Sequence, residues 1–412
     1  MKKKLLLICQ HFYPEMVSTG LHMTELATYI NTHYSDIEIE VLCSYPSKNI
    51  FKETDVADEY HKVRIIRKKS IGKEHGSVIS RLLYGASFFM RVMGYLLLHQ
   101  KKYAGFIITT NPPFLGITTV LTKKIFSKPF FLIVYDVYPD VAVKLGILKA
   151  SSLITKLWSF ITVSILKNAK AFAVIGRDME KIVVSKAKNI KDKSVLIYNW
   201  SDEQHVKPGD AGENLFLQQH PELKGRHLFI YSGNMGRTHN MEDILAFAKE
   251  CSEEKLFHFL IIGGGAKFDA MKESANQLSN VTVLPYQPYE LLPHLLSAAT
   301  FCLVCLDKSF TGYSVPSKTY GIMAAGKPVI AFLAADSEIG MAVNEAGCGF
   351  VISDNNMKPL KEKVLNALQT GKHIKMGESA LKSFIQKYTL QIAAEKYYEA
   401  FKKLSEAGIV AE

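Results

Sequence analysis

The sequence lacks a hydrophobic run long enough to span a membrane, since no stretch of about 18 uninterrupted apolar residues occurs in its 412 residues. Residues 5–9 are apolar and follow three lysines, but the run is too short for a signal peptide and ends in Gln10 and His11. We therefore expect residues 5–9 to form a buried strand and the protein to stay in the cytoplasm.

Cysteine is scarce, with six in the chain, and most of them lie inside apolar runs. Cys302 and Cys305 form a C-x-x-C pattern, but neither a second cysteine pair nor histidine ligands stand nearby. The pattern favours a buried strand over zinc or redox chemistry, and we predict no metal site. Reduced thiols agree with a cytoplasmic protein.

Basic residues outnumber acidic ones: the chain has 50 Lys and Arg and 39 Asp and Glu, which gives a formal net charge of +11. This surplus indicates an acidic partner, and the candidates are nucleic acid, anionic lipid and phosphorylated substrates. No zinc-finger, helix-turn-helix or RNA-recognition pattern accompanies the basic residues, so we predict no nucleic-acid partner.

Apolar runs of strand length alternate with amphipathic segments of helix length, a pattern typical of an α/β doubly wound parallel sheet. Neither half of the chain opens with G-x-G-x-x-G, which argues against a nicotinamide or flavin dehydrogenase. The runs form two series and so predict two Rossmann-like domains. They are 5–9, 39–43, 63–66, 105–109, 130–134, 171–175 and 195–197, then 228–232, 258–262, 281–284, 301–305, 329–332 and 349–351.

The polar segment 199–212 is rich in turn-forming residues and separates the two series. We predict an N-terminal domain over 1–200 and a C-terminal domain over 201–378. The remaining segment, 379–412, is expected to contain one long helix over 379–404 that returns over the first domain.

Two loops of the second half have the composition of phosphate-binding loops. Tyr231-Ser232-Gly233-Asn234-Met235-Gly236-Arg237 follows an apolar strand and precedes a helical stretch. Its glycines let backbone N–H groups approach an anion, the helix N-terminus adds partial positive charge, and Arg237 is a two-pronged donor. An ordinary strand-to-helix turn is the alternative for this loop alone. The second loop, Val315-Pro316-Ser317-Lys318-Thr319, is also basic and favours the anion site.

Further motifs occur in a fixed order along nearly the whole chain. They are His11-Phe12-Tyr13-Pro14-Glu15, Ser18-Thr19-Gly20, Asp136-Val137-Tyr138-Pro139-Asp140, Ile197-Tyr198-Asn199-Trp200, Ile261-Ile262-Gly263-Gly264-Gly265, and Ala324-Ala325-Gly326-Lys327-Pro328. Together with the two loops they resemble the GT-B glycosyltransferases, specifically the retaining family 4. The resemblance is closest to the branch that transfers aminosugars such as N-acetyl-fucosamine in bacterial surface-polysaccharide assembly.

The resemblance implies two Rossmann-like domains facing a cleft and no cofactor. The first domain would bind the acceptor, which is expected to be polyprenyl-diphosphate-linked or an oligosaccharide. The second would bind a nucleotide-sugar donor, expected to be UDP-linked.

In that family an arginine and a lysine a few residues later neutralise the donor diphosphate without a protein-bound metal. Arg237 matches the arginine, but Glu242 stands at the lysine position. We therefore expect Lys318 to supply the second cation, with the Ser317 hydroxyl beside it. A solvent-facing lysine and a helix N-cap serine are the alternatives.

Two glutamates that many family members use to hold the sugar and the ribose are missing, because Tyr313 and Gly321 stand at their positions. A different sugar preference follows. The donor-binding candidates are polar or glycine residues at predicted strand and helix ends, the glycine triplet and the 286–288 loop being expected to enclose the base. They are Gly20, Gly233, Asn234, Gly263, Gly264, Tyr286, Gln287, Ser314, Ser317 and Tyr320.

In the first domain, Asp136 follows the predicted strand 130–134 at its carboxyl end, where ligands bind in open α/β sheets. We predict that Asp136 binds an acceptor hydroxyl or acts as a weak base, with a helix-capping carboxylate as the alternative. His11 and Glu15 follow the first strand and are predicted to contact the acceptor. Gly20 has a tight-turn role as its alternative.

The sequence shows no evident carboxylate nucleophile, and the resemblance then favours a front-face route. In this route the departing phosphate takes up the proton of the acceptor hydroxyl. Two other functions compete. A UDP-sugar 2-epimerase of the same fold needs acid and base carboxylates, so the missing glutamates count against it. An inactive nucleotide-sugar-binding scaffold agrees with their loss.

Residues 79–98 and 152–167 are strongly apolar, and Arg81 and Arg91 interrupt the first stretch. Interfacial helices with basic anchors fit this composition, and core helices are the alternative. With the basic first domain, these stretches predict docking on the anionic inner face of the cell membrane.

Overall fold

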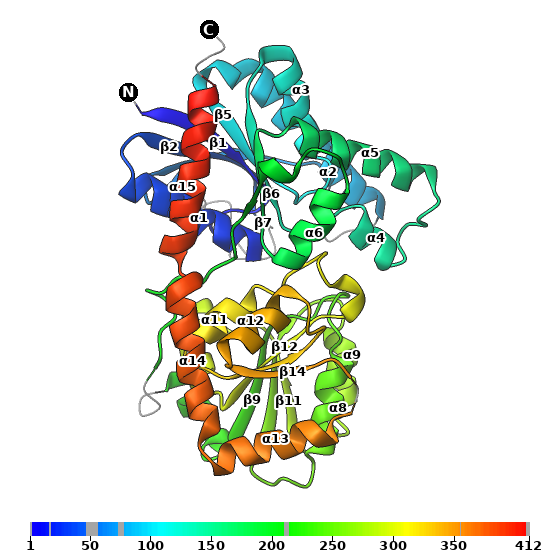
Figure 1. Cartoon of the computed structure of the whole chain (residues 1–412), viewed down its shortest axis with the longest axis vertical. Coiled ribbons are helices and arrows are strands. Elements are labelled where there is room, and N and C mark those ends of the chain that lie inside the picture. The colour runs from blue at the N-terminus through cyan, green and yellow to red at the C-terminus, as the bar shows by residue number, and fades with distance from the viewer. Residues whose placement is uncertain are drawn as a thin grey trace. The chain divides into compact units, whose positions relative to one another are not determined.

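The structure is a computed structural model that describes residues 2–15, 18–46, 57–72, 78–209, 214–354 and 356–408. The chain divides into two compact units (Figure 1). The first unit consists of Met1–Tyr198 and Leu390–Glu412, and the second unit of Asn199–Thr389. The chain therefore passes between the units twice, once close to the boundary that we placed at residue 200.

The first unit is built on an eight-stranded sheet with the order β3-β4-β2-β1-β5-β6-β7-β8. Neighbouring strands run parallel, except that β3 pairs antiparallel with β4. Strands β5 and β6 are buried at every position, so their sequences are continuous apolar runs. The strands are β1 (Lys3–Ile8), β2 (Ile37–Ser44), β3 (Glu59–Tyr60), β4 (Val63–Lys68), β5 (Gly105–Thr109), β6 (Phe130–Val134), β7 (Ala171–Val174) and β8 (Ser194–Leu196).

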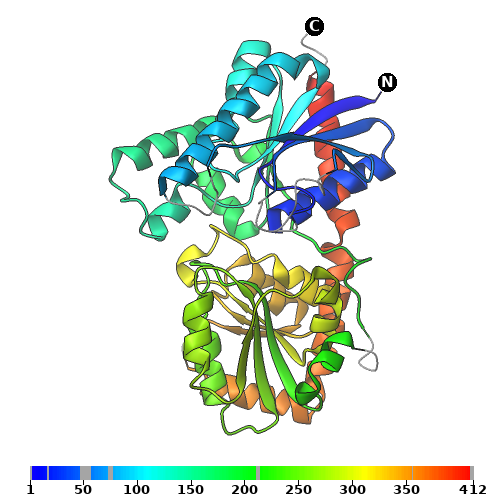
Figure 2. The ribbon, with the colours of Figure 1, turned by 180° about the vertical axis from the view of Figure 1, so that it is seen from behind.

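Helices cover both faces of this sheet, as Figures 1 and 2 show from opposite sides. On one face α1 packs against α15, and on the other α3 packs against both α2 and α5. The helices are α1 (Ser18–His33), α2 (Val78–His99), α3 (Gly116–Phe126), α4 (Asp140–Lys144), α5 (Leu153–Asn168), α6 (Arg177–Ser185) and α15 (Leu390–Ala407). No helix in the described ranges is long and apolar enough to cross a membrane.

The second unit has a six-stranded, fully parallel sheet with the order β11-β10-β9-β12-β13-β14. Its strands are β9 (His227–Asn234), β10 (Phe257–Gly264), β11 (Val281–Leu284), β12 (Phe301–Cys305), β13 (Val329–Phe332) and β14 (Gly349–Ile352). Its helices are α7 (Leu215–Gln219), α8 (Glu242–Glu250), α9 (Phe268–Ala275), α10 (Leu292–Ala298), α11 (Lys318–Ala324), α12 (Glu338–Ala346), α13 (Lys358–Gln369) and α14 (Lys372–Lys387).

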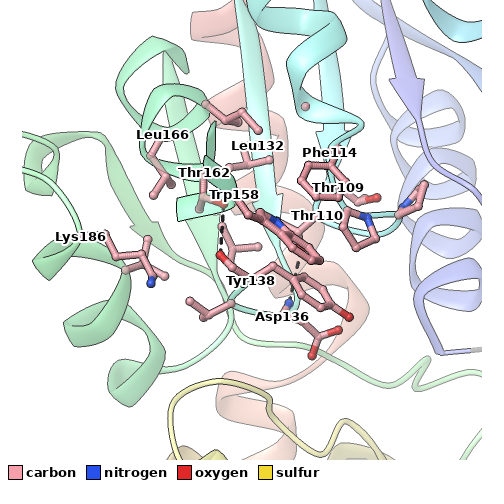
Figure 3. A pocket seen from close by; sticks show the side chains of 17 residues that line it. Thr109, Thr110, Phe114, Leu132, Asp136, Tyr138, Trp158, Thr162, Leu166 and Lys186 are labelled. Atoms are coloured by element: carbon pink, nitrogen blue, oxygen red, sulfur yellow. Dashed lines mark hydrogen bonds between the residues drawn. The ribbon is translucent and has the colours of Figure 1, made fainter. Parts of the chain in front are cut away.

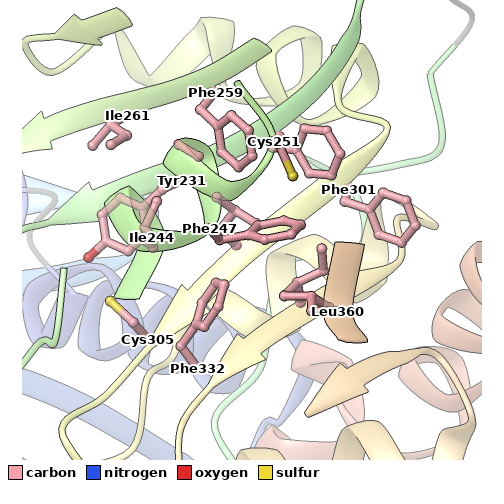
Figure 4. Close-up of a cluster of buried hydrophobic side chains, with 14 of the residues drawn as sticks. Tyr231, Ile244, Phe247, Cys251, Phe259, Ile261, Phe301, Cys305, Phe332 and Leu360 are labelled. Carbon is pink, nitrogen blue, oxygen red and sulfur yellow. The ribbon is translucent and has the colours of Figure 1, made fainter. Parts of the chain in front are cut away.

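Phenylalanines form the core beneath α8 (Figure 4). The ring of Phe229 stacks on that of Phe259, with centroids 4.7 Å apart, and Phe247 of α8 meets Phe259 edge to face at 5.4 Å. Such pairs stabilise the core beyond the area they bury. Cys302 and Cys305 lie on β12 as buried free thiols, as the C-x-x-C pattern in an apolar run predicted.

The predicted single helix over 379–404 is wrong, because α14 ends at Lys387 and α15 begins at Leu390. The break is held by a backbone bridge between Ser201 and Thr389, in which the Ser201 N–H donates to the Tyr388 carbonyl oxygen at 3.2 Å. Tyr388 leaves the helical conformation at ψ 17° and φ −127°. As a result α14 belongs to the second unit and only α15 returns to the first.

Candidate functional site

The carboxyl ends of β9 and β10 form a close junction made by two glycines. Gly233 and Gly263 are paired in register and have φ values of 140° and 148°. A Cβ on Gly263 would lie 1.9 Å from the Gly233 carbonyl oxygen, so no side chain fits there. The loops beyond are joined by Met235 N–H donating to the Gly264 carbonyl oxygen (2.7 Å) and Lys267 N–H donating to that of Met235 (3.0 Å).

We predict that Gly263→Ala destabilises the second unit by about 2–5 kcal/mol, through the combined cost of backbone strain and overpacking. Gly321→Ala is the matched control, because a Cβ there meets nothing closer than the Ser201 hydroxyl at 3.7 Å. Urea unfolding of both variants measures the difference. Equal stability of the two variants would show that the junction tolerates a side chain.

Lys318 reaches this junction from the first turn of α11. Its Nζ lies 3.6 Å from the centre of the Tyr231 ring and 3.0 Å from the point that a Cβ on Gly233 would occupy. The side chain as a whole is partly exposed, but Nζ itself is buried and has no hydrogen-bond partner among the described residues. Burial lowers the pKa of Lys318 to about 8. Burying an ammonium without an anion beside it costs free energy. Such an ammonium is therefore expected in a site that binds an anionic ligand.

Positive charge also surrounds this point. Burial, and then the charges of Lys318 and Lys267, lower the pKa of His239 to about 3, so the imidazole is neutral at physiological pH. Arg237, in the loop after β9, is exposed. The loop therefore adds an exposed guanidinium to a buried ammonium.

Lys267 is a basic residue of this region that sequence reasoning missed. Its Nζ donates to both carboxylate oxygens of Glu242, at 3.0 Å each. Glu242, at the position where the family resemblance implies a lysine, therefore holds a lysine from the next strand's loop. The signal was present, since Lys267 follows the glycine triplet 263–265 by two residues.

The other predicted donor residues have mixed surroundings. Ser317 occupies the N-cap position of α11, but its side chain makes no cap hydrogen bond. Tyr320 is fully buried and packs against Tyr388 with ring centres 4.9 Å apart, which favours a packing role over a donor contact. Ser314 is partly buried.

Four further donor-binding candidates lie at or just after strand ends, and all but the first of them are predicted to enclose the base: Asn234, Gly264, Tyr286 and Gln287. Asn234, the last residue of β9, is exposed, and its Oδ1 is 2.2 Å from the point that a Cβ on Gly265 would occupy. The Tyr286 ring covers Gly264, where a Cβ would come within 2.9 Å of it, yet Tyr286 remains 60% exposed. Gln287 donates to the Pro285 carbonyl oxygen at 3.0 Å. An exposed ring at a strand's carboxyl end is suited to stacking on a flat ligand.

In the first unit, His11 and Glu15 lie in the loop that follows β1. His11 Nδ1 is 2.8 Å from Glu15 Oε2, and both side chains are largely buried. Gly20, in the first turn of α1, is covered by this loop, because a Cβ there would lie 2.4 Å from the Glu15 carbonyl oxygen. Close packing therefore requires a glycine at position 20, which favours a tight-turn role over contact with the donor.

Asp136 follows β6, and its backbone N–H donates to Thr110 Oγ1 at 3.3 Å. It lines a pocket at the carboxyl ends of β5 and β6, together with Tyr138 and Trp158 (Figure 3). The loops after β1 and β6 leave the same edge of the sheet, on either side of β5. The edge thus carries both sets of residues that we predicted for the acceptor.

Within the described ranges, no three or more His, Cys, Asp and Glu side chains gather in an arrangement that could hold a metal ion. Metal-independent chemistry stays a prediction.

Comparison with known proteins finds a family match within the second unit. Residues 213–383 match the family described as glycosyl transferases group 1. The probable glycosyltransferase WbjE of Pseudomonas aeruginosa is 33% identical over 249 residues, which are 60% of this chain and 62% of that protein. The match thus spans less than two thirds of WbjE. The putative colanic acid biosynthesis glycosyl transferase WcaI of Escherichia coli is 23% identical over 90% of this chain and 93% of its own length.

Solved structures resemble the chain along nearly its whole length. The sucrose-phosphate synthase of Thermosynechococcus elongatus has a TM-score of 0.75 at 15% identity, covering 98% of this chain and 100% of that one. Anabaena HepE, solved with UDP and glucose, has a TM-score of 0.72 at 14% identity, covering 97% and 99%. At these identities the likeness shows the fold. The chain therefore has the two-domain α/β fold of the GT-B glycosyltransferases, and its segment 213–383 matches the glycosyl transferases group 1 family.

Proposed function

We propose that the protein is a retaining GT-B glycosyltransferase of family 4. It moves a sugar, an N-acetylated aminosugar by our expectation, from a UDP-linked donor to a lipid-linked or oligosaccharide acceptor in surface-polysaccharide synthesis. The buried Lys318 ammonium, which has no hydrogen-bond partner in the described part of the chain and lies beside the glycine junction of β9 and β10, carries this proposal. The names of WbjE and WcaI support it at the level of the reaction and the pathway class.

The donor diphosphate gains negative charge as the bond to the sugar breaks. Lys318 is preorganised for that charge, because its Nζ is held over the Tyr231 ring and needs little reorganisation to meet an anion. The exposed Arg237 adds a bidentate donor to the same oxygens. These two cations stabilise the leaving group, and the leaving phosphate takes the acceptor proton in a front-face transfer.

Asp136 contributes from the first unit in this proposal. As a carboxylate at the end of β6 it orients the acceptor hydroxyl by accepting its hydrogen bond, while the pair His11 and Glu15 shapes the same edge of the sheet. The aromatic residues Tyr138 and Trp158 stack face to face beside it at 5.5 Å. The acceptor therefore meets a polar rim next to an apolar wall.

Transfer with retention is the test of this function. The protein is incubated with a panel of UDP-sugars and a synthetic polyprenyl-diphosphate-linked sugar, and the anomeric configuration of the product is determined by NMR. Epimerised UDP-sugar without transfer would indicate a 2-epimerase. UDP binding without any turnover of donor or acceptor would indicate a scaffold.

We also propose that the face formed by α2, α3 and α5 docks on the anionic inner face of the membrane. Residues 78–170 contain twelve Lys and Arg but only two Asp and no Glu, so they hold a net +10 of the chain's +11. The same helices expose large apolar side chains, among them Met90, Leu98 and Ile125. Of the two arginines that we singled out, Arg91 is exposed, and the side chain of Arg81 lies outside the described residues.

The docking face predicts binding to vesicles that contain anionic lipid and release at roughly 0.5 M salt, where charges are screened within a few ångströms. The double variant Lys149→Glu/Lys156→Glu is expected to weaken this binding, because both lysines are exposed beside the apolar face of α5. Lys363→Glu, an exposed lysine of the second unit, is the control. Equal co-sedimentation with neutral and anionic vesicles contradicts electrostatic docking.

A further inference from the structure

The pocket beside Asp136 extends inward between β6, α3 and α5, where its lining is almost entirely apolar (Figure 3). We propose that it binds the hydrocarbon chain of a polyprenyl phosphate, the carrier part of the acceptor. This rests on the proposed function in one respect only, the lipid-linked nature of the acceptor. The chain would lie in the pocket while its phosphate stays at the rim.

The lining explains why an apolar chain fits better than a sugar. Its deep wall consists of Leu132, Val134, Ile165, Leu166 and Val183. The polar groups there are already engaged, since Thr162 Oγ1 donates to the Tyr138 carbonyl oxygen at 3.1 Å. Sugar hydroxyls placed against this wall would lose their hydrogen bonds with water, whereas methyl and methylene groups gain by burial.

The mouth is framed by three aromatic rings. Trp158 stacks on Tyr138 and meets the Phe114 ring at 4.3 Å. Phe114 has a φ of 71°, a conformation that a bulky residue adopts only when its surroundings impose it. The Phe114 ring lines the pocket, and backbone strain of this kind gathers at ligand-binding sites.

A route from the pocket to a lipid surface exists on α5. Trp158 lies on this helix, and Leu153, Leu157 and Phe160 are 83%, 61% and 72% exposed on it. Their spacing of four and three residues places them on one face. No Asp or Glu occurs between residues 141 and 170, while five lysines do. A lipid with an anionic head group is thus complementary to both the apolar face and its charge.

The rim of the pocket carries charged groups that could contact the phosphate head group of the lipid. Lys186 lines the pocket, and its Nζ donates to Asp140 Oδ2 at 2.5 Å. A phosphate at the rim would share this ammonium, and Asp136 on the same rim would then lie next to the sugar that the phosphate bears. The pocket therefore positions the acceptor from its lipid end.

Tryptophan fluorescence tests the proposal without requiring activity, because the chain has two tryptophans and only Trp158 lines the pocket. The probe is 12-bromododecyl monophosphate below its micelle concentration, with bromine as the quencher. We expect saturable quenching in the full-length protein, none with inorganic phosphate, and loss of the quenched component in Trp158→Phe. Farnesyl monophosphate is expected to displace the probe at least as well as dodecyl monophosphate.

Thr162→Phe fills the pocket and is expected to weaken probe binding by about tenfold or more. Leu166→Phe is a second filling variant in case the first does not fold. Ile385→Phe is the control, since Ile385 is exposed on α14 in the second unit and does not line the pocket. Unchanged quenching in a folded filling variant, or much better displacement by the linear chain, overturns the proposal. Probe binding in a protein that transfers no sugar would uphold the pocket and reject the transferase function.

Discussion

Replacing Lys318 with methionine is expected to stabilise the second unit and to weaken UDP binding at the same time. The substitution removes a buried ammonium that has no hydrogen-bond partner among the described residues, and keeps a side chain of similar length. Because burial lowers the pKa of Lys318 from 10.5 to about 8, the gain at neutral pH is on the order of 1–3 kcal/mol. Loss of the charge-assisted contact should weaken UDP binding roughly tenfold to hundredfold.

The pH dependence separates this explanation from a general packing effect. A folded-state pKa below the unfolded value means that the ammonium destabilises the fold fully below pH 8. As the pH rises from about 8 to 10.5, the folded protein loses this proton first, so wild type gains stability relative to Lys318→Met. Urea unfolding across this range measures the gain, and calorimetry with UDP measures affinity. Lys363→Met is the control. A Lys318 variant with unchanged UDP affinity would contradict the assignment of Lys318 to the donor diphosphate.

The variant Arg237→Ala should lower turnover by roughly 10²- to 10³-fold, because one preorganised donor at the developing charge is lost. Stability should stay near wild type, since Arg237 is exposed in a loop. Arg226→Ala is the matched control, as Arg226 precedes β9 at its opposite end and contacts His258 at 3.2 Å.

The double variant Arg237→Ala/Lys318→Met shows whether both cations serve one diphosphate. If they do, the loss in the double variant differs from the sum of the two single losses, as it does for groups that share a partner. Strict additivity in UDP affinity and turnover would place the two side chains on separate ligands. Arg237→Ala turnover within about twofold of wild type would exclude the guanidinium from the reaction.

The sheets were predictable because parallel strands covered on both faces are continuous apolar runs, as β5 and β6 illustrate. The two-residue strand β3 was missed, since Glu59 and Tyr60 are too short to show a period and pair only with their neighbours in β4. The break between α14 and α15 was missed for another reason. It depends on Ser201, almost two hundred residues away in sequence, which binds the Tyr388 carbonyl oxygen.

The candidate site was partly predictable. Lys318 could be singled out because a basic residue after Pro316 and Ser317 begins a helix, but the Tyr231 ring beneath its Nζ could not be inferred from order along the chain. The pairing of Glu242 with Lys267 joins two loops, and only the register of β9 and β10 brings them together. The stack of Tyr138 on Trp158 likewise arises from packing of α5 on the sheet edge.

The double passage of the chain between the units has a consequence for biosynthesis. The second unit is one continuous segment, Asn199–Thr389, whereas the first needs α15, which packs against α1 and contacts β1 and β6. Tyr34 and Tyr398 stack at 3.6 Å across that contact. Because a chain emerges from the ribosome N-terminal end first, the second unit can complete its fold while the first still lacks its last helix. The part of the protein that is made first is therefore finished last.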